Sequence, residues 1–346
     1  MSQPLDRYRK QVLFAGLREE GQQRLAASRV VVCGCGALGT VVAEALVRAG
    51  VGHVRIIDRD FVELSNLQRQ VLFDEDDVRS RTPKAMAAAE KLRRVNSEIQ
   101  IEPVVADIDA GNVRSLVEGA DLILDGTDNF EVRFLLNDVS LETGIPWIYA
   151  GVIGSHGQTM PVFPGRTACL RCLIESPPEA GSMETCDTAG VIGPAVNVVA
   201  SLEAAIALKI LSGHADEVSP ELTIVDVWSM SFRSMSVRDL RAKSACPACH
   251  QGERTWLRGE RGSQSIVLCG RNAVQVSPSE KGKVSLDELA DRWRASGTVQ
   301  KNAWLARLSL RGPDLEITVF RDGRAIIQGT EDLAMARGLY ARYVGS

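Results

Sequence analysis

A glycine-rich turn near the N-terminus has the spacing of a phosphate-binding loop. The segment "GCGALG" places Gly34, Gly36 and Gly39 in the pattern G-x-G-x-x-G, after the apolar run "SRVVVCG" and before a stretch with helical apolar spacing. Glycines between a strand and a helix let the backbone turn tightly and approach phosphates at the positive end of the helix dipole. Asp58 ends the next apolar run, "HVRIID", where a carboxylate can accept a hydrogen bond from a ribose hydroxyl. The sequence therefore predicts a nucleotide site; the alternative is a turn whose glycines serve packing alone.

Polar and charged side chains follow the predicted strand ends, and their types suit a triphosphate. The segment "DRDFVELSNLQRQ" carries amide and guanidinium groups after the second strand, and "DGTDN" follows a later one. Ligands bind at the carboxyl ends of strands in open α/β sheets, so these groups can converge on one crevice. A triphosphate bound for reaction needs donors and cations around its phosphates and an acid that holds Mg²⁺. The candidate nucleotide-binding residues at these strand ends are Gly34, Gly36, Gly39, Asp58, Asp60, Asn66, Arg69, Gln70, Lys84, Asp128 and Asn129.

Three of these side chains are candidate catalytic residues for ATP chemistry. Arg69 and Lys84 can neutralise phosphate charge, and Asp128 can hold magnesium. Taken singly, each residue type is more often a solvated surface group or a helix cap. Asp128 could simply cap the helix that begins at Asn129. The shared placement of the set at strand ends favours the ATP site.

Strands alternate with helices over the first half of the chain. The predicted strands span 28–34, 53–58, 99–106, 120–126 and 145–151, and the predicted helices span 36–50, 82–96, 112–119 and 129–144. In the second helix Thr82 is expected to be the N-cap, with Pro83 at the first helical position. Alternation of this kind means βαβ units, so we expect a doubly wound, mostly parallel, Rossmann-like α/β sheet.

The regular alternation of strands and helices ends after residue 151. An antiparallel strand is predicted over 157–163, a helix over 191–211 after a Gly/Pro/Ser-rich loop, and strands over 221–229 and 231–237. We expect these antiparallel strands to extend the sheet within one domain over residues 1–252.

A second, smaller domain is expected over residues 253–346, because the amino-acid composition changes at residue 253. It is interpreted as an α+β unit of the form β-α-β-β-α, and its hairpin "LEITVFRDGRAIIQG" has a favourable Asp-Gly turn. Cys269 in "LCGRN" is similar to a rhodanese persulfide loop, but it falls in the first predicted strand, which favours a core cysteine. An oligomerisation or carrier-docking module is the hypothesis for this domain.

Four of the eight cysteines form two C-x-x-C pairs. "CLRC" contains Cys169 and Cys172, and "CPAC" contains Cys246 and Cys249. Two such pairs make a closed, tetrahedral Cys₄ zinc site with a structural role. Paired spacing rather than a disulfide ladder fits a reduced cytosol, and two unrelated thiol pairs or a redox motif are the alternative.

A further cysteine, Cys186, lies in the polar loop "ETCDTAGVIGPAV". It is near the N-terminus of the helix predicted over 191–211, whose dipole could favour its thiolate. We therefore include Cys186 among the candidate catalytic residues, with an inert surface cysteine as the alternative.

The order and spacing of five segments resemble one protein family. "RYRKQVLF", "GCGALG", "DRDFVELSNLQRQ", "TPK" and "DGTDNFEVR" are similar to the ThiF/MoeB/HesA family, bacterial relatives of ubiquitin-activating (E1-like) enzymes, and the resemblance covers about residues 5–250. It implies a homodimer that uses ATP and Mg²⁺ to adenylate the C-terminal glycine of a small ubiquitin-like sulfur-carrier protein ending in Gly-Gly. It also implies a structural zinc and a separate sulfur donor that thiolates the activated carboxyl group.

For single residues, the resemblance implies Asp58 on the ribose, Asn66, Arg69 and Lys84 around the phosphates, and Asp128 on magnesium. It further implies that Cys186 forms a covalent link to the carrier, as in ThiF-like members; in MoeB-like members a cysteine stands there without being needed for adenylation.

The resemblance also implies that a basic residue from the partner subunit's N-terminal segment reaches the ATP. Lys10 stands at that position, beside Arg9. A lysine keeps the positive charge of the arginine but lacks its bidentate fork.

Composition excludes several other classes of protein. The net charge of -4 gives no electrostatic reason to expect a nucleic-acid or membrane-surface partner. The N-terminal segment has no apolar core with a small-residue cleavage site, so a cytoplasmic location is expected. The apolar stretch "AVNVVASLEAAIALKIL" contains Glu203 and Lys209 and falls short of the roughly 20 residues that span a bilayer, which indicates a buried or interface helix.

Three rival functions remain open at this level. An NAD-dependent oxidoreductase would use the glycine turn but has no need of the amide and arginine groups after Asp58. An E1-like enzyme that acts on a tRNA-borne carboxylate would share the ATP site, although no basic, aromatic-interleaved patch is visible. A non-catalytic nucleotide-binding scaffold would not need so complete a set of charges.

Overall fold

The chain folds into two units. The computed structural model describes residues 6–177, 189–261, 265–268, 272–277, 284–312 and 314–345. The N-terminal unit comprises Met1–Arg261 and the C-terminal unit comprises Gly262–Ser346.

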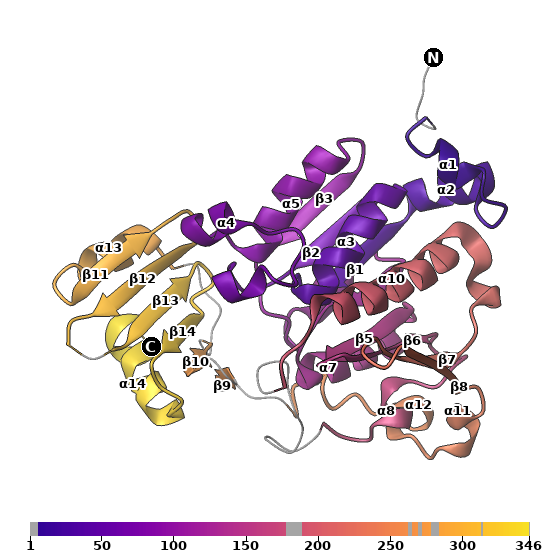
Figure 1. Ribbon diagram of the computed structural model, residues 1–346. Helices are drawn as coiled ribbons and strands as arrows, with labels where there is room; N and C mark the ends of the chain where they lie inside the picture. Colours follow the sequence, from indigo (N-terminus) through magenta and orange to yellow (C-terminus); the bar gives the residue numbers. More distant parts are fainter. Residues whose placement is uncertain are drawn as a thin grey trace. The chain divides into compact units, whose positions relative to one another are not determined.

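The N-terminal unit is built on one eight-stranded mixed sheet (Figure 1). Its strands are β1 (Arg29–Cys33), β2 (His53–Ile57), β3 (Gln100–Val104), β4 (Leu122–Asp125), β5 (Trp147–Ile153), β6 (His156–Val162), β7 (Glu221–Asp226) and β8 (Ser231–Ser236). The spatial order is β3-β2-β1-β4-β5-β6-β7-β8; the first five strands are parallel and the last three antiparallel. This confirms the predicted doubly wound sheet with added antiparallel strands.

Helices cover both faces of this sheet because its parallel strands are apolar on both sides. Val30 and Val32 of β1 pack in one core, whereas the alternating residues Val31 and Cys33 pack in the other. The first core also includes side chains of α3, α5 and α10, and the second includes those of α6, α7, α8 and α12. Helices α3 and α10 lie side by side on the near face in Figure 1.

The helices of the N-terminal unit vary from one turn to seventeen residues. They are α1 (Arg9–Val12), α2 (Arg18–Ala27), α3 (Ala37–Ala49), α4 (Glu75–Ser80), α5 (Lys84–Val95), α6 (Val113–Val117), α7 (Phe130–Thr143), α8 (Leu170–Leu173), α10 (Gly193–Lys209), α11 (Leu240–Lys243) and α12 (Pro247–His250). Short turns of other helix types span η1 (Leu64–Asn66), η2 (Ile210–His214) and η3 (Ala215–Glu217). The N-cap of α5 is Pro83 rather than the predicted Thr82, whose carbonyl instead accepts a hydrogen bond from Val62.

Helix α10 is a core helix, as its two charged residues suggested. Together with η2 and η3 it forms a helical run, Gly193–Glu217, long and apolar enough to cross a membrane by length and composition, but half of its most apolar window is buried inside the fold. It packs on α3, β5 and β6, and Glu203 in its middle is fully buried. This agrees with the expectation of a buried or interface helix.

The boundary between the units lies nine residues later than the predicted boundary after residue 252. Residues 253–261 belong to the N-terminal unit because Trp256 and Leu257 pack in the core beside α7. The Trp256 ring lies 5.4 Å from the Phe134 ring, and the Trp256 amide donates to the Asp138 carboxylate at 3.1 Å. The compositional change at residue 253 therefore marks an extension that packs in the second core, on the α7 side of the sheet.

Over its described residues, the C-terminal unit forms a six-stranded antiparallel sheet with two helices. Its elements are β9 (Ser265–Leu268), β10 (Ala273–Val276), α13 (Leu286–Trp293), β11 (Gly297–Lys301), β12 (Leu305–Leu310), β13 (Glu316–Phe320), β14 (Ala325–Gln328) and α14 (Leu333–Tyr343), in the sheet order β11-β12-β13-β14-β10-β9. The α+β class is confirmed, but the simple β-α-β-β-α form is wrong because it omitted β10 and β11. Both are short strands, and β11 is mostly exposed and polar, so neither shows a strong apolar alternation.

Replacing Trp256 tests whether residues 253–261 stabilise the N-terminal unit. Trp256 is 8% exposed, so Trp256→Ala is expected to lower the free energy of unfolding of this unit by about 3–5 kcal/mol. The matched control is Trp228→Ala, at a residue 82% exposed, which is expected to change it by less than about 0.5 kcal/mol. Urea unfolding followed by circular dichroism measures both, and equal midpoints for the two variants would show that the assignment is wrong.

Candidate functional site: the carboxyl ends of the parallel strands

The turn from β1 to α3 is shaped by close backbone contacts. Gly34 has φ +91°, a left-handed conformation that glycine adopts without strain. A Cβ atom at Gly39 would lie 1.9 Å from the Gly34 carbonyl oxygen, so no side chain fits there. A Cβ at Gly36 would meet only Gln70 Nε2 and the Gly126 oxygen, at 3.8 and 3.9 Å. The loop is therefore tightly closed on its inner side and open at Gly36, where α3 begins and its amides point outward.

Asp58 ties the end of β2 to this glycine loop. Its Oδ2 accepts from the Cys35 amide at 2.7 Å, and its Oδ1 accepts from the Asp60 amide at 2.7 Å. Burial raises the pKa of Asp58, and the positive charge of Lys84 opposes that rise. Each carboxylate oxygen has a second lone pair, so Asp58 can hold the loop and still accept from a ligand hydroxyl.

Lys84 is a buried cation at the start of α5. It is 4% exposed, its Nζ lies 3.5 Å from Asp60 Oδ2, and its amide donates to the Asp60 carbonyl at 2.8 Å. A lysine is rarely buried without a paired acid, and Asp60 provides one. The predicted residues Asp58, Asp60 and Lys84 thus lie together, where β2 ends and α5 begins.

Arg59 is a site residue that the sequence reasoning missed. It pairs with Asp107 Oδ1 at 3.1 Å and lies 3.8 Å from Asp60 Oδ1. Burial opposes its charge, but Asp107, Asp60, Asp128 and Asp58, in that order, raise the pKa of its guanidinium. Its position between two acids in "IIDRDF" was the available signal. Because Asp128 acts on the same guanidinium, the ends of β2 and β4 share one electrostatic environment.

The segment after β2 contributes residues of two kinds. The Asn66 side chain accepts from the Glu63 amide at 3.1 Å and closes a capping box on η1, so it has a structural role. Arg69 donates to the Ser65 carbonyl at 2.9 Å. Gln70 is 4% exposed, and its Oε1 has no hydrogen-bond partner among the described residues. A buried amide that faces Gly36 and lacks a partner is a candidate ligand contact.

The turn after β4 carries Asp128 to the surface. Asn129, not Asp128, caps α7: its Oδ1 accepts from the Glu131 amide at 2.7 Å. The alternative role of Asp128 as the cap of that helix is therefore wrong, and Asp128 is exposed. Asp125 shapes the turn from below, since its Oδ1 accepts from the Thr127 amide and hydroxyl at 2.9 and 2.7 Å.

The two C-x-x-C pairs meet in space on the α7 side of the sheet. Cys169 and Cys246 are the N-caps of the short helices α8 and α12, and the second cysteine of each pair lies inside its helix. The four sulfur atoms lie within 4.8 Å of one another, with Sγ–Sγ distances of 3.9 Å (Cys169–Cys172), 3.8 Å (Cys169–Cys246) and 3.6 Å (Cys172–Cys249). Zinc with Zn–S bonds of about 2.3 Å and tetrahedral geometry needs Sγ–Sγ distances of about 3.8 Å. The donor set therefore fits zinc.

Lys10 lies far from the glycine loop of its own chain. It is exposed on α1, which Tyr8 and Gln11 anchor: the Tyr8 hydroxyl accepts from Asn96 Nδ2 at 2.7 Å, and Gln11 Nε2 donates to the Ala49 carbonyl at 2.9 Å. Ala49 and Asn96 lie at the C-terminal ends of α3 and α5. Because α3 has 13 residues, its two ends are about 20 Å apart. Lys10 therefore does not reach the candidate site of its own chain, and the expected contact from a partner subunit stays a prediction.

Two predicted cysteines lie outside the described residues. Cys186 falls in 178–188 and Cys269 in 269–271, so their proposed roles stay predictions.

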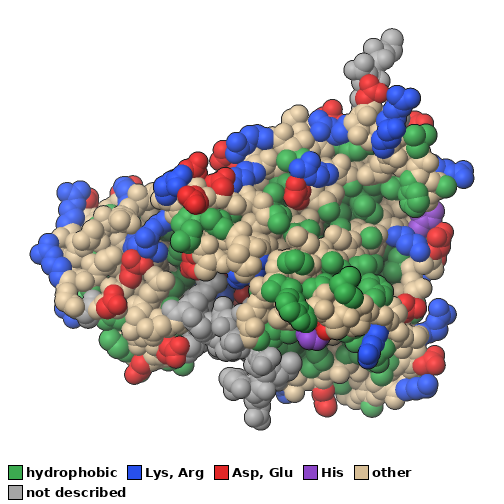
Figure 2. Space-filling view, viewed as in Figure 1, with side chains coloured by type: hydrophobic (Ala, Val, Ile, Leu, Met, Phe, Trp, Pro, Cys, Tyr) green, Lys and Arg blue, Asp and Glu red, His purple; other side chains and the backbone are tan. Residues whose placement is uncertain are grey.

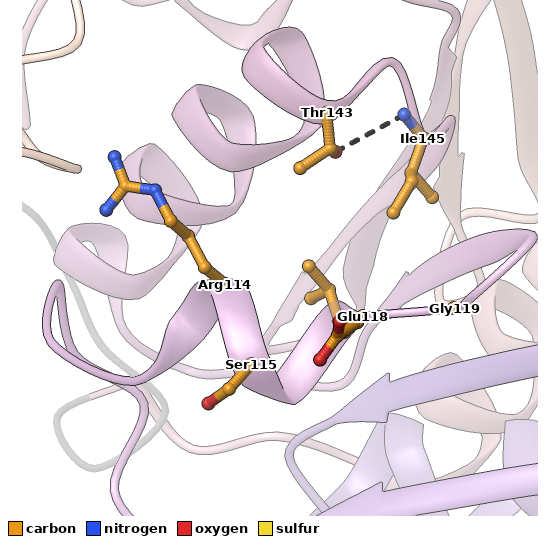
Figure 3. Close-up of a pocket in the computed structure, with 7 residues that line it drawn as sticks. Arg114, Ser115, Glu118, Gly119, Thr143 and Ile145 are labelled. Atoms are coloured by element: carbon orange, nitrogen blue, oxygen red, sulfur yellow. Dashed lines mark hydrogen bonds between the residues drawn. The ribbon is translucent and has the colours of Figure 1, made fainter.

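A pocket of about 440 Å³ lies at the opposite edge of the sheet (Figure 3). Its lining residues are Arg114, Ser115, Val117, Glu118, Gly119, Thr143 and Ile145. Glu118 and Gly119 precede β4, and Thr143 and Ile145 precede β5, so the pocket lies at the amino ends of these strands. It is separate from the charged residues at the carboxyl ends.

Comparisons with known proteins agree with this geometry. Residues 8–248 match the ThiF family. The chain is 44% identical over 340 residues to the sulfur carrier protein ThiS adenylyltransferase of Bacillus subtilis, covering 98% of this chain and 99% of that protein. It is 37% identical over 244 residues to the Escherichia coli protein of the same name, covering 70% of this chain and 94% of that protein.

Solved structures of Escherichia coli MccB are similar in fold. The crystal structure of MccB with ATP has a TM-score of 0.57 and 27% identity, covering 67% of this chain and 68% of that chain. The structure with MccA-N7isoASN has a TM-score of 0.61 and 25% identity, covering 72% and 74%. On the glycine loop, the strand-end residues and these matches, the chain belongs to the ThiF family.

Proposed function

We propose that this protein adenylates the C-terminal glycine of a small ubiquitin-like sulfur-carrier protein that ends in Gly-Gly. The observation that carries the proposal is the meeting of Asp58, Arg59, Lys84 and Asp128 beside the glycine loop at one edge of the sheet. Relatives named sulfur carrier protein adenylyltransferases, and an ATP-bound structure of similar fold, support it.

ATP would lie across the carboxyl ends of β1, β2 and β4. Asp58 would accept from the ribose hydroxyls through its remaining lone pairs, and the phosphates would meet the open backbone at Gly36 and the α3 N-terminus. Gln70, whose Oε1 lacks a partner among the described residues, faces the same loop. Asn66 and Asn129 would act by shaping their loops, because both side chains cap helices.

The reaction would be a nucleophilic substitution at the α-phosphorus of ATP. The carrier's C-terminal carboxylate attacks, the bond from the α-phosphorus to the oxygen that bridges the α- and β-phosphates breaks, and pyrophosphate leaves, so that the acyl-adenylate remains. Lys84 and Arg69 would neutralise phosphate charge, and Asp128, exposed at the end of its turn, would hold Mg²⁺ with the pyrophosphate oxygens. No protein nucleophile is needed for this step, and a separate sulfur donor would thiolate the product.

Zinc would have a structural role, as a cross-link between two segments of the chain. The cluster joins α8 to α12, and α8 is fixed to α7 because the Leu170 amide donates to Asn137 Oδ1 at 2.9 Å. The bound metal would therefore hold the segment after residue 240 against the sheet. Free thiolate ligands persist in a reducing compartment, which is consistent with the cytoplasmic location that we also propose.

A homodimer would supply the missing cation. Lys10 is on the wrong edge of its own sheet, so only a second subunit can bring it to the phosphates. Exposed apolar side chains occur on the N-terminal segment and on α10, including Leu13 at 72%, Phe14 at 64% and Val198 at 38%. Hydrophobic side chains gather on the surface where Figure 1 places α10 (Figure 2). Such apolar patches mark contact surfaces between proteins.

Removing the charges at the strand ends should abolish adenylation. In assays of ATP–pyrophosphate exchange with a ThiS-type carrier ending in Gly-Gly, Asp128→Asn and Lys84→Met are each expected to lower the rate by about 100-fold or more, because charge stabilisation is lost. Matched controls are Asp121→Asn, at the other end of β4, and Lys91→Met, later on α5 and paired with Asp74 and Asp77. Both controls should keep the wild-type rate. Normal exchange by Asp128→Asn and Lys84→Met would refute the assigned roles.

The cysteine cluster should contain one zinc ion per chain. Cys249→Ser removes one of four ligands, so the purified variant is expected to lose the metal and to unfold at lower temperature. Cys33→Ala, at a buried cysteine outside the cluster, should retain zinc. Elemental analysis of the purified proteins decides the question: a zinc-free wild type, or a Cys249→Ser variant with full zinc content, would disprove the site.

Mixing two inactive variants tests the contribution of Lys10 in trans. Lys10→Ala and Lys84→Met should each be inactive in exchange, but random heterodimers contain one site with Lys84 from one chain and Lys10 from the other. Half of the dimers are mixed and each has one competent site, so about one quarter of wild-type activity should return. Each variant refolded alone is the control. A mixture no more active than the two variants alone would exclude the trans arrangement.

A further inference from the structure

Glu203 is a buried acid in an otherwise apolar helix. It is 0% exposed in the middle of α10, among Val196, Val199 and Ala200, which pack in the core. Its Oε2 has no hydrogen-bond partner among the described residues. Burying a carboxyl group costs more free energy than burying an apolar side chain of similar volume. Packing alone therefore does not explain a glutamate at this position.

The other oxygen of Glu203 holds the end of a strand. Oε1 accepts from the Asp125 amide at 3.0 Å, across 78 residues of sequence. Strand β4 pairs with β5 at Ile123 and Leu124, so this pairing stops one residue before Asp125. Glu203 thus provides an acceptor for the amide at the point where the two strands separate.

Arg133 completes this junction from the opposite face of the sheet. Its Nε donates to Asp125 Oδ2 at 3.0 Å, and its Nη2 donates to the Thr127 carbonyl at 2.7 Å and the Ala150 carbonyl at 3.0 Å. Arg133 belongs to α7 and Glu203 to α10, which cover different faces. The end of β4 is therefore held from both sides, immediately before the turn that carries Asp128.

The charges of this junction are consistent with a neutral Glu203. Burial, and then the negative charge of Asp125, raise the pKa of Glu203 well above its usual range. Arg133 is already balanced by Asp125, to which it is hydrogen-bonded. A protonated Glu203 can accept the amide hydrogen bond without adding a second negative charge beside Asp125.

We propose that Glu203 is a positioning residue of the nucleotide site: through the Asp125 amide it fixes the end of β4 and the turn that presents Asp128. The inference rests on the proposed function, in which Asp128 holds Mg²⁺. Helix α10 would then have two roles: it packs in the core, and through Glu203 it fixes the geometry at the end of β4.

Glu203→Leu separates positioning from stability. Leucine removes the acceptor and keeps a similar volume; it relieves the cost of a buried carboxyl group but leaves the Asp125 amide without this acceptor, so its two effects on stability oppose each other. We expect a wild-type unfolding temperature, a kcat for pyrophosphate exchange lowered by about 10-fold or more, and a higher half-saturating Mg²⁺ concentration. Glu203→Gln keeps an acceptor oxygen and is expected to stay within about 3-fold of the wild-type kcat.

Val199→Ala is the matched control on the same helix. Val199 is 1% exposed, and its apolar side chain cannot accept the Asp125 amide hydrogen bond, so the variant should lose stability but keep kcat. A wild-type kcat in Glu203→Leu, or an equal loss in Glu203→Gln, would overturn the proposal. Hydrogen exchange of the wild type provides a measurement that does not depend on variants: the Asp125 amide should exchange as slowly as that of Leu124, and fast exchange would overturn the proposal even if Glu203→Leu fails to fold.

The design also separates this inference from the proposed function. If the wild type shows no carrier-dependent exchange, the adenylation proposal fails and the positioning role fails with it. If the wild type is active and only the Glu203 variants behave unexpectedly, adenylation stands and the positioning role alone is rejected.

Discussion

The backbones of two loops touch at the carboxyl edge of the sheet, and the candidate site depends on that contact. A Cβ atom at Gly126 would lie 2.4 Å from the Gly34 carbonyl oxygen and 2.9 Å from the Gly39 Cα. Only glycine permits this approach, so the loop after β1 and the turn after β4 form one close-packed body. Asp58 joins the same body through the Cys35 amide. The residues assigned to ribose, phosphates and metal are therefore placed by backbone contacts rather than by long flexible side chains.

The balance of charge around this body favours a nucleotide that arrives with its metal. Four carboxylates act on the single guanidinium of Arg59, and Asp60 also pairs with Lys84. A free polyanion would meet more acids than cations here. A divalent ion, if held by Asp128 as proposed, would change that balance, because it would neutralise both the acid and the phosphate oxygens. Below this layer, Asp125 and Arg133 form a balanced pair, so the charges that shape the turn do not compete with those that would face the ligand.

Local patterns predicted most of the fold and much of the site. Short apolar runs that alternate with helical segments, and the glycine spacing, identified the parallel strands. Asp58 and Asp128 follow strand ends and Lys84 opens α5, and all three lie at one edge of the sheet. The boundary between the two units was predicted wrongly because it depends on contacts between residues that are far apart in the sequence. Residues 253–261 return to α7 through Trp256 and Asp138. This contact has no local sequence signal.

The residues that cap helices and the partners of buried side chains also could not be predicted from the sequence. The choice between Asp128 and Asn129 as the α7 cap depends on backbone geometry that differs by one residue. Arg59 was visible in the sequence, but its four acidic neighbours come from separate segments. The bond between Glu203 and Asp125 joins a helix to a strand end that the sequence does not pair. Short strands such as β10 and β11 lacked the alternation that identifies longer ones.

A crystal structure with a non-hydrolysable ATP analogue and Mg²⁺ tests the central claim most directly. The account predicts the ribose on Asp58, the phosphates against the backbone at Gly36 and beside Lys84, and the metal on Asp128. A nucleotide bound elsewhere, such as the pocket beside Arg114, or a metal without Asp128 among its ligands, would contradict it.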